Sequence, residues 1–211
     1  MSAGADQQLL VSLINTLHVP DGDDQLEDER ARSWLLDHGA TGERVEQFGL
    51  DSLRQLREGL RELALANNNG EADEDVVARA RTSISALPMS VQLGDFDDGP
   101  SIVAPAGAGP AQQVIARTFN AYLGERARGS WRRIKACAAP DCHYAYLDTS
   151  RNISRRWCDM AECGNRAKNR TWRTRRASTR ANDGEGSKHY RPLTSLDGFP
   201  DTSASYVLTG K

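Results

Sequence analysis

The sequence predicts an α+β protein in which a mostly helical N-terminal domain is followed by a small cysteine-containing domain. Apolar residues recur every three or four positions in five segments of the first 126 residues, as on one face of a helix. All four cysteines fall later, within residues 137–163, and the charge changes sign between the two parts. With 211 residues and 23.2 kDa, the chain can hold one large domain or two modest ones.

The N-terminal domain is expected over residues 6–126. Its helices are predicted over residues 6–18, 26–37, 52–66, 76–87 and 111–126. Asp51 or Ser52 is a candidate cap for the third helix, and Pro110 suits the first turn of the fifth. Met89–Leu93 and Ser101–Ala104 alternate or cluster apolar residues on either side of a turn. They predict a small β-hairpin between the fourth and fifth helices.

The net charge of −2 conceals a strong segregation of charge along the chain. Residues 1–125 carry nine basic and 21 acidic residues, whereas residues 126–180 carry 15 basic and four acidic residues. Such segregation indicates two surfaces with different partners. From Ala177 onward the chain is rich in Ser, Thr, Gly and Asp. This composition predicts a disordered tail over residues 177–211.

The four cysteines form two close pairs, Cys137 with Cys142 and Cys158 with Cys163, separated by a medium spacer. Each pair can sit on one tight turn, and folding the spacer back brings four thiolates around one tetrahedral ion. We therefore predict one structural zinc ion. Two disulfides are the main alternative, but the N-terminus lacks an export signal and favours a reducing compartment.

The spacing leaves the metal itself open, because iron–sulfur centres also use four cysteines. Four cysteine ligands leave no open position for water, which favours a structural rather than a catalytic ion. His143 is adjacent to Cys142 and is interpreted as an ordinary strand residue rather than a ligand. The sequence shows no Ser-His-Asp order, P-loop or Gly-rich phosphate loop, so no enzymatic activity is expected.

The cysteine-containing domain is expected over residues 131–176 as a small ββα-type finger of treble-clef or ribbon-like form. Tyr144–Leu147 and the segment near Arg156 and Trp157 are predicted as its two strands. The pattern becomes helical from Asp159, which places the second cysteine pair at a helix start. There the positive end of the helix dipole favours thiolate over thiol.

The helix that follows Cys163 is strongly basic, with six Lys or Arg residues and no acid between residues 166 and 176. Such a concentration of charge indicates a polyanionic partner, and a helix can enter the major groove of DNA. A solvated charged helix is the simpler alternative. Asn165 and Arg166 could instead bond the metal turn or pair with Asp148. The candidate nucleic-acid contacts are Arg151, Arg155, Arg156, Arg166, Lys168, Asn169, Arg170, Arg173, Arg175 and Arg176.

The residues Cys163-Gly-Asn-Arg166, with Leu147–Asn152 and Arg155–Cys158, resemble the CGNR zinc finger family. Upstream, Ile14–His18 followed by helices is similar to the ABATE domain that precedes this finger in bacterial proteins. The resemblance implies a stress-responsive bacterial transcription regulator with the finger on DNA. It also implies that the four cysteines are the zinc ligands.

We therefore expect a regulator that binds double-stranded DNA, with the N-terminal domain sensing a small-molecule ligand or forming a dimer. RNA binding and use of the finger as a protein-interaction module are the alternatives. The longest apolar runs, such as Leu63–Ala66 and Ile102–Ala106, are far shorter than the roughly 18 residues of a membrane helix. No membrane partner is expected, and the predicted location is the cytoplasm, on the nucleoid when DNA is bound.

Overall fold

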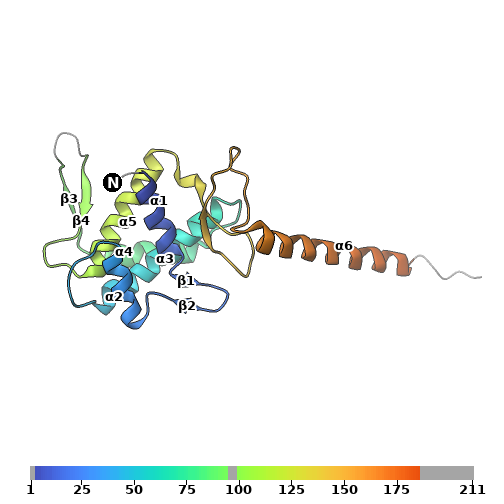
Figure 1. The fold of residues 1–211 in the computed structure, drawn as a ribbon, viewed down its shortest axis with the longest axis horizontal. Helices are drawn as coiled ribbons and strands as arrows, with labels where there is room; N and C mark the ends of the chain where they lie inside the picture. Colours follow the sequence, from blue (N-terminus) through green and yellow to red (C-terminus); the bar gives the residue numbers. More distant parts are fainter. Residues whose placement is uncertain (1–2, 95–98, 186–211) are drawn as a thin grey trace, which may run out of the picture. The chain divides into compact units, whose positions relative to one another are not determined.

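The structure is a computed structural model, and it describes residues 3–94 and 99–185. The chain divides into two compact units, Met1–Arg170 and Thr171–Lys211, and each is considered by itself. The first unit contains the first five helices, the small sheets and all four cysteines (Figure 1). None of the described helices is both long and apolar enough to cross a membrane.

Six α-helices are present in the described residues, and the first five belong to the first unit. They are α1 (Ala3–Ile14), α2 (Asp28–Asp37), α3 (Gln47–Ala66), α4 (Glu74–Ser85), α5 (Pro110–Ala127) and α6 (Asn165–Glu185). Asp73 caps α4 because its carboxylate accepts hydrogen bonds from the backbone of Asp75 and Val76. Pro110 occupies the first turn of α5, as predicted.

Three short antiparallel hairpins accompany the helices. They are formed by β1 (Leu17–His18) with β2 (Asp23–Asp24), β3 (Ser90–Gln92) with β4 (Ser101–Val103), and β5 (Ile134–Ala136) with β6 (Ala145–Leu147). The β3–β4 hairpin was predicted. The β1–β2 hairpin was not, and both residues of β1 fall within the helix predicted over residues 6–18. The overall result is the expected mixture of a helical N-terminal region and small sheets.

One apolar core joins the helices to residues 131–164, which we call the cysteine segment. Ile134 and Ala136 of β5 and Ala145 of β6 are fully buried in the same cluster as the leucines of α1 and α3. In keeping with this, β5 packs against α3 and β6 packs against α1. The cysteine segment therefore shares one apolar core with the helices.

Two asparagines at the C-terminal end of α3 supply the polar part of this junction. The side-chain amide of Asn67 donates to the carbonyls of Trp131 and Ile134, both at 2.9 Å. The buried amide of Asn68 donates to the carbonyls of Ala136 at 2.7 Å and Arg156 at 2.8 Å. The carbonyls of Trp131 and Arg156 also accept backbone N–H bonds, and the asparagines add side-chain bonds to them. The end of α3 therefore positions the cysteine segment.

Several predicted helix boundaries differ from the structure, and α1, for example, ends at Ile14 rather than at residue 18. The third helix begins at Gln47 with Glu46 as its N-cap, so the prediction of Asp51 or Ser52 as the cap is wrong. The hydroxyl of Ser52 instead donates to the carbonyl of Phe48 within the helix. At the other end of the chain, α6 continues through residues 177–185, where the composition predicted a disordered tail. The rest of that predicted tail, residues 186–211, lies outside the described residues.

The replacement Asn68→Ala tests the junction. Two backbone carbonyls would lose a buried donor, which costs about 1–3 kcal/mol of unfolding free energy. We expect a lower midpoint in urea unfolding of the zinc-loaded protein. Asn69→Gly is the matched control, because Asn69 is exposed and has φ 60°, which glycine adopts without strain. Equal stability of the two variants would show that the junction contributes little.

Candidate metal centre and basic surface

The four cysteines come from two turns of the cysteine segment. Cys137 directly follows β5, and Cys142 lies in the turn that leads to β6. Cys158 precedes the short helical turn η2 (Met160–Gly164), which contains Cys163. Asp159 caps that turn by accepting hydrogen bonds from the backbone of Ala161 and Glu162. The prediction that the second pair lies at a helix start therefore agrees with the structure.

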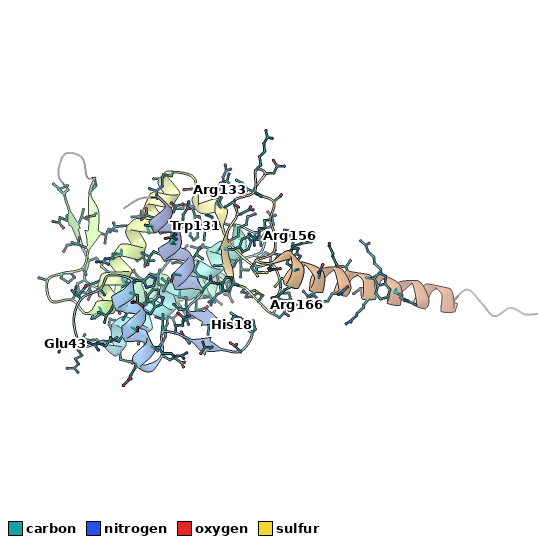
Figure 2. All side chains as sticks on the ribbon, viewed as in Figure 1. His18, Glu43, Trp131, Arg133, Arg156 and Arg166 are labelled. Atoms are coloured by element: carbon teal, nitrogen blue, oxygen red, sulfur yellow. The ribbon has the colours of Figure 1, made fainter. Side chains whose placement is uncertain are left out.

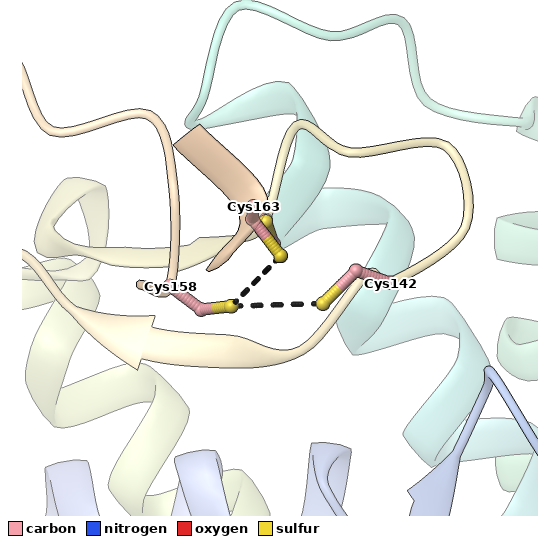
Figure 3. Close-up of side chains that lie close together, drawn as sticks. Cys142, Cys158 and Cys163 are labelled. Carbon is pink, nitrogen blue, oxygen red and sulfur yellow. Dashed lines mark hydrogen bonds between the residues drawn. The ribbon is translucent and has the colours of Figure 1, made fainter. Parts of the chain in front are cut away.

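The sulfur atoms of the four cysteines all lie within 4.8 Å of one another. The Sγ atom of Cys158 is 3.6 Å from that of Cys142 and 3.7 Å from that of Cys163 (Figure 3). A tetrahedron with zinc–sulfur bonds of about 2.3 Å has edges of about 3.8 Å. The cage thus has the dimensions of a site for one ion, and all four cysteines are free of disulfides.

Two thiols of this cage, those of Cys142 and Cys158, resist ionisation when no cation is present. Burial is the main reason that the pKa of Cys142 is raised to about 11 and that the pKa of Cys158 is raised still further. A divalent ion reverses this preference because it binds thiolates and displaces their protons. The donor set and its spacing fit a single soft or borderline ion such as zinc. An iron–sulfur cluster places several atoms between its cysteines and needs a wider cage.

Arg166 lies beside the metal-binding turn. Its guanidinium donates to the Sγ atom of Cys163 at 3.1 Å and lies 3.6 Å from a carboxylate oxygen of Asp141. Burial alone would raise the pKa of Cys163, but the hydrogen bond from Arg166 and those from the other three cysteines together outweigh burial, and the pKa is lowered. Of the two roles predicted for Arg166, the structure therefore shows the contact with the metal turn and not the pairing with Asp148. The Asn165 amide donates to Ala161 in the same turn.

A buried ion pair organises the loop between β6 and Cys158. The ammonium of Lys135 lies 2.8 Å from the Asp148 carboxylate, and both side chains are almost completely buried. Lys135 also donates to the carbonyls of Ile153 and Arg155, so all three of its protons are used. Asp148 in turn accepts from the backbone of Ser150 and Arg155. The sequence did not reveal this pair, because charged residues so far apart carry no local signal of burial.

Two features of the cysteine segment differ from the prediction. The strand partner of β6 is β5, which precedes Cys137, and the segment at Arg156 and Trp157 is not a strand. His143 is not a strand residue, because its φ of 53° places it in the left-handed region of a turn. The order of two strands followed by a helix is present, whereas its assignment to the treble-clef or ribbon type remains a prediction.

All ten candidate nucleic-acid contacts have exposed side chains. Figure 2 shows Arg156 in the loop before Cys158 and Arg166 in the first turn of α6. Some of them also have partners within the protein. Arg155 donates to the carbonyl of Trp157 at 2.8 Å and lies over the ring of Tyr146, and Arg170 lies 3.8 Å from Asp141. Exposed contacts of this kind are weak, so these side chains remain able to bind phosphate.

In the second unit, the exposed side chains include Arg173, Arg175 and the pair formed by Trp172 and Arg176. The guanidinium of Arg176 lies 5.0 Å from the centre of the Trp172 ring, and 56% of Trp172 is exposed. An exposed aromatic ring beside arginines is a surface that can contact sugar or base as well as phosphate.

The fold and the cysteine cage define a zinc-finger protein, and comparison with known families agrees. Residues 133–176 match the family model of the CGNR zinc finger. Residues 7–129, more than half of the chain, match the ABATE family model, described as "Putative stress-induced transcription regulator". The chain therefore belongs to the ABATE family and carries a C-terminal CGNR zinc finger, in the order that the sequence predicted. No curated protein matches the chain.

The replacement Arg166→Gln is expected to weaken metal binding in a pH-dependent way. Without the guanidinium the pKa of Cys163 rises, so protons compete with the metal up to a higher pH. Zinc release during acid titration, followed with a chromogenic chelator, should therefore begin at a higher pH than in the parent protein. Arg173→Gln is the control on the same helix. An identical release profile for the two variants would contradict a role for Arg166.

The replacement Asp148→Asn is expected to cost about 3–5 kcal/mol of unfolding free energy, because it leaves the Lys135 ammonium buried without its counter-ion. Asp141→Asn, which removes an exposed carboxylate, should cost less than about 1 kcal/mol. Both values can be measured by urea unfolding at pH 7 with zinc in excess.

The pH dependence of the Asp148 contribution follows from its pKa. Burial raises that pKa, but the bonds from Lys135 and Ser150 outweigh burial and lower it from 3.8 to about 2. A carboxyl with a lowered pKa stabilises the fold above its unfolded pKa and loses that effect as the pH falls toward its folded value. The difference between the parent protein and Asp148→Asn should therefore stay constant from pH 8 to pH 5. A difference that shrinks already near pH 6 would rule out this assignment.

Proposed function

We propose that this protein is a DNA-binding transcription regulator whose cysteine segment is held by one structural zinc ion. The observation that carries the proposal is the exposed basic surface that directly follows the metal cage. Residues 166–176 of α6 contain six basic residues and no acid, and all of their basic side chains are exposed. Like charges at this density repel one another, and a polyanion relieves that repulsion.

The zinc ion has a structural task in this proposal. It ties the turn after β5 to the turn that begins α6, and the four cysteines leave no position for a substrate or a reactive water. Arg166 remains at the cage through Cys163, so its main task is positional. The phosphate contacts are assigned chiefly to Lys168, Arg173, Arg175 and Arg176. Asn169 is a candidate for reading a base edge, since an amide can pair with adenine.

The family description supports regulation of transcription rather than any other use of a basic helix. Double-stranded DNA is therefore the proposed partner, and the helical N-terminal domain is the proposed sensor or dimerisation unit. RNA and an acidic protein are the competing partners, because the same arginines would attract either. The cell compartment that this role requires is the cytoplasm, on the nucleoid when DNA is bound.

Selection of bound sequences from a random duplex pool, with structured RNA as competitor, tests the proposal directly. An enriched motif that survives competition supports a sequence-specific regulator. Preferential loss to the RNA competitor would replace DNA by RNA as the partner. Failure to bind either nucleic acid at low salt would overturn the proposal and direct attention to an acidic protein.

The number of phosphate contacts can be tested by the salt dependence of binding. The double variant Lys168→Gln with Arg173→Gln should lower the slope of log K against log salt by up to about two units, because each lost phosphate contact contributes about 0.9. Arg32→Gln with Arg79→Gln removes the same charge from exposed positions of α2 and α4 and should leave the slope unchanged. Equal effects of the two double variants would indicate attraction by net charge rather than contact by α6.

A further inference from the structure

A cavity of about 420 Å³ lies among α3, α4 and α5 in the helical domain. This volume falls within the usual range of small-molecule sites, about 300–1,000 Å³. Its wall is mainly apolar and includes Leu60, Leu63, Val77, Ile84, Phe119 and Tyr122. A glycine helps shape it: a Cβ on Gly59 would lie 2.6 Å from the Cβ of Ala80, so glycine allows α4 to approach α3 closely.

The charged residues of this cavity are all of one sign. Arg81 of α4 and Arg126 of α5 line it, and no carboxylate does so among the described residues. The contrast with the surrounding domain is strong, because residues 1–125 contain 21 acids and only nine basic residues. Within the described part of the chain, neither arginine has an ion-pair partner.

The polar groups of the cavity favour an acceptor on the ligand. The Thr118 hydroxyl already donates to the carbonyl of Val114. The remaining donors are the phenol of Tyr122 and the two guanidiniums, which bind carboxylates and phosphates with strong, charge-assisted hydrogen bonds. An apolar wall with cationic donors matches a molecule that has a hydrophobic body and an anionic end.

We propose that this cavity binds an amphipathic organic anion, such as a medium-chain or aromatic carboxylate. The proposal specifies the ligand class for the sensor role given above to the helical domain, and it rests on that role only for its biological meaning. Hydrocarbon contacts with the leucines and Phe119 provide the affinity. Arg81 and Arg126, one from each of two helices, select the charge.

Calorimetric titration of the full-length, zinc-loaded protein with decanoate and with 1-naphthoate tests the proposal without DNA. We expect saturable binding of at least one of them at one site per chain. Decylammonium, with the same chain length as decanoate and the opposite charge, should bind at least about tenfold more weakly. Absence of saturable binding for both carboxylates, or equal binding of decanoate and decylammonium, would overturn the proposal.

Variants locate the site. Arg81→Ser with Arg126→Ser should weaken carboxylate binding about tenfold or more, whereas Arg79→Ser should not change it. Arg79 is a matched control because it is exposed on the same helix, two residues before Arg81, and does not line the cavity. An effect of Arg79→Ser as large as that of the double variant, or no effect of the double variant, would place the anion elsewhere. DNA selection is measured separately, so failure of the ligand site and failure of DNA binding are distinguishable.

Discussion

The end of α3 is the constraint on which the cysteine segment depends. Asn67 and Asn68 bond four carbonyls of that segment, and Ile134 lies in the same core as the leucines of α3. A three-residue strand pair has too little buried area to be stable alone. The helices supply the missing apolar surface. The cysteine cage lies in a second, smaller buried cluster, and the zinc ion proposed for the cage would stabilise that cluster.

Two cations in and beside the cysteine segment have different structural roles. Lys135 is buried with Asp148 and holds a loop, while Arg166 supports the thiolate of Cys163. Ile153 shows the effect of this organisation on the backbone: its φ of 50° is unfavourable for a β-branched residue, and Lys135 holds its carbonyl in place.

Sequence reasoning succeeded where the signal is local. Cysteine spacing predicted the cage, because metal geometry limits how close ligands in one turn can be. Helical periodicity predicted five N-terminal helices, because each helix buries one continuous stripe of apolar side chains. It failed for contacts between distant residues. Asn67 and Asn68 directly follow the helix predicted over residues 52–66, and nothing near them in the sequence indicates their partners. The strand β5 is too short to show a strand pattern before Cys137. The third helix was predicted to begin near residue 52 because Asp51 and Ser52 are residue types that often cap helices. In the structure both residues lie inside α3, which begins at Gln47.

The proposed ligand cavity and the cysteine segment share one aromatic contact. Tyr122 lines the cavity, and its ring meets that of Trp131 edge to face, with the centroids 4.8 Å apart. Trp131 is the first residue of the cysteine segment, and its carbonyl accepts from Asn67. A ligand can change DNA affinity through this contact only if it binds two arrangements of Tyr122 unequally. Such coupling is reciprocal, so DNA would change ligand affinity by the same factor. The packing of Tyr122 on Trp131 is therefore the physical link that the proposed sensor would use.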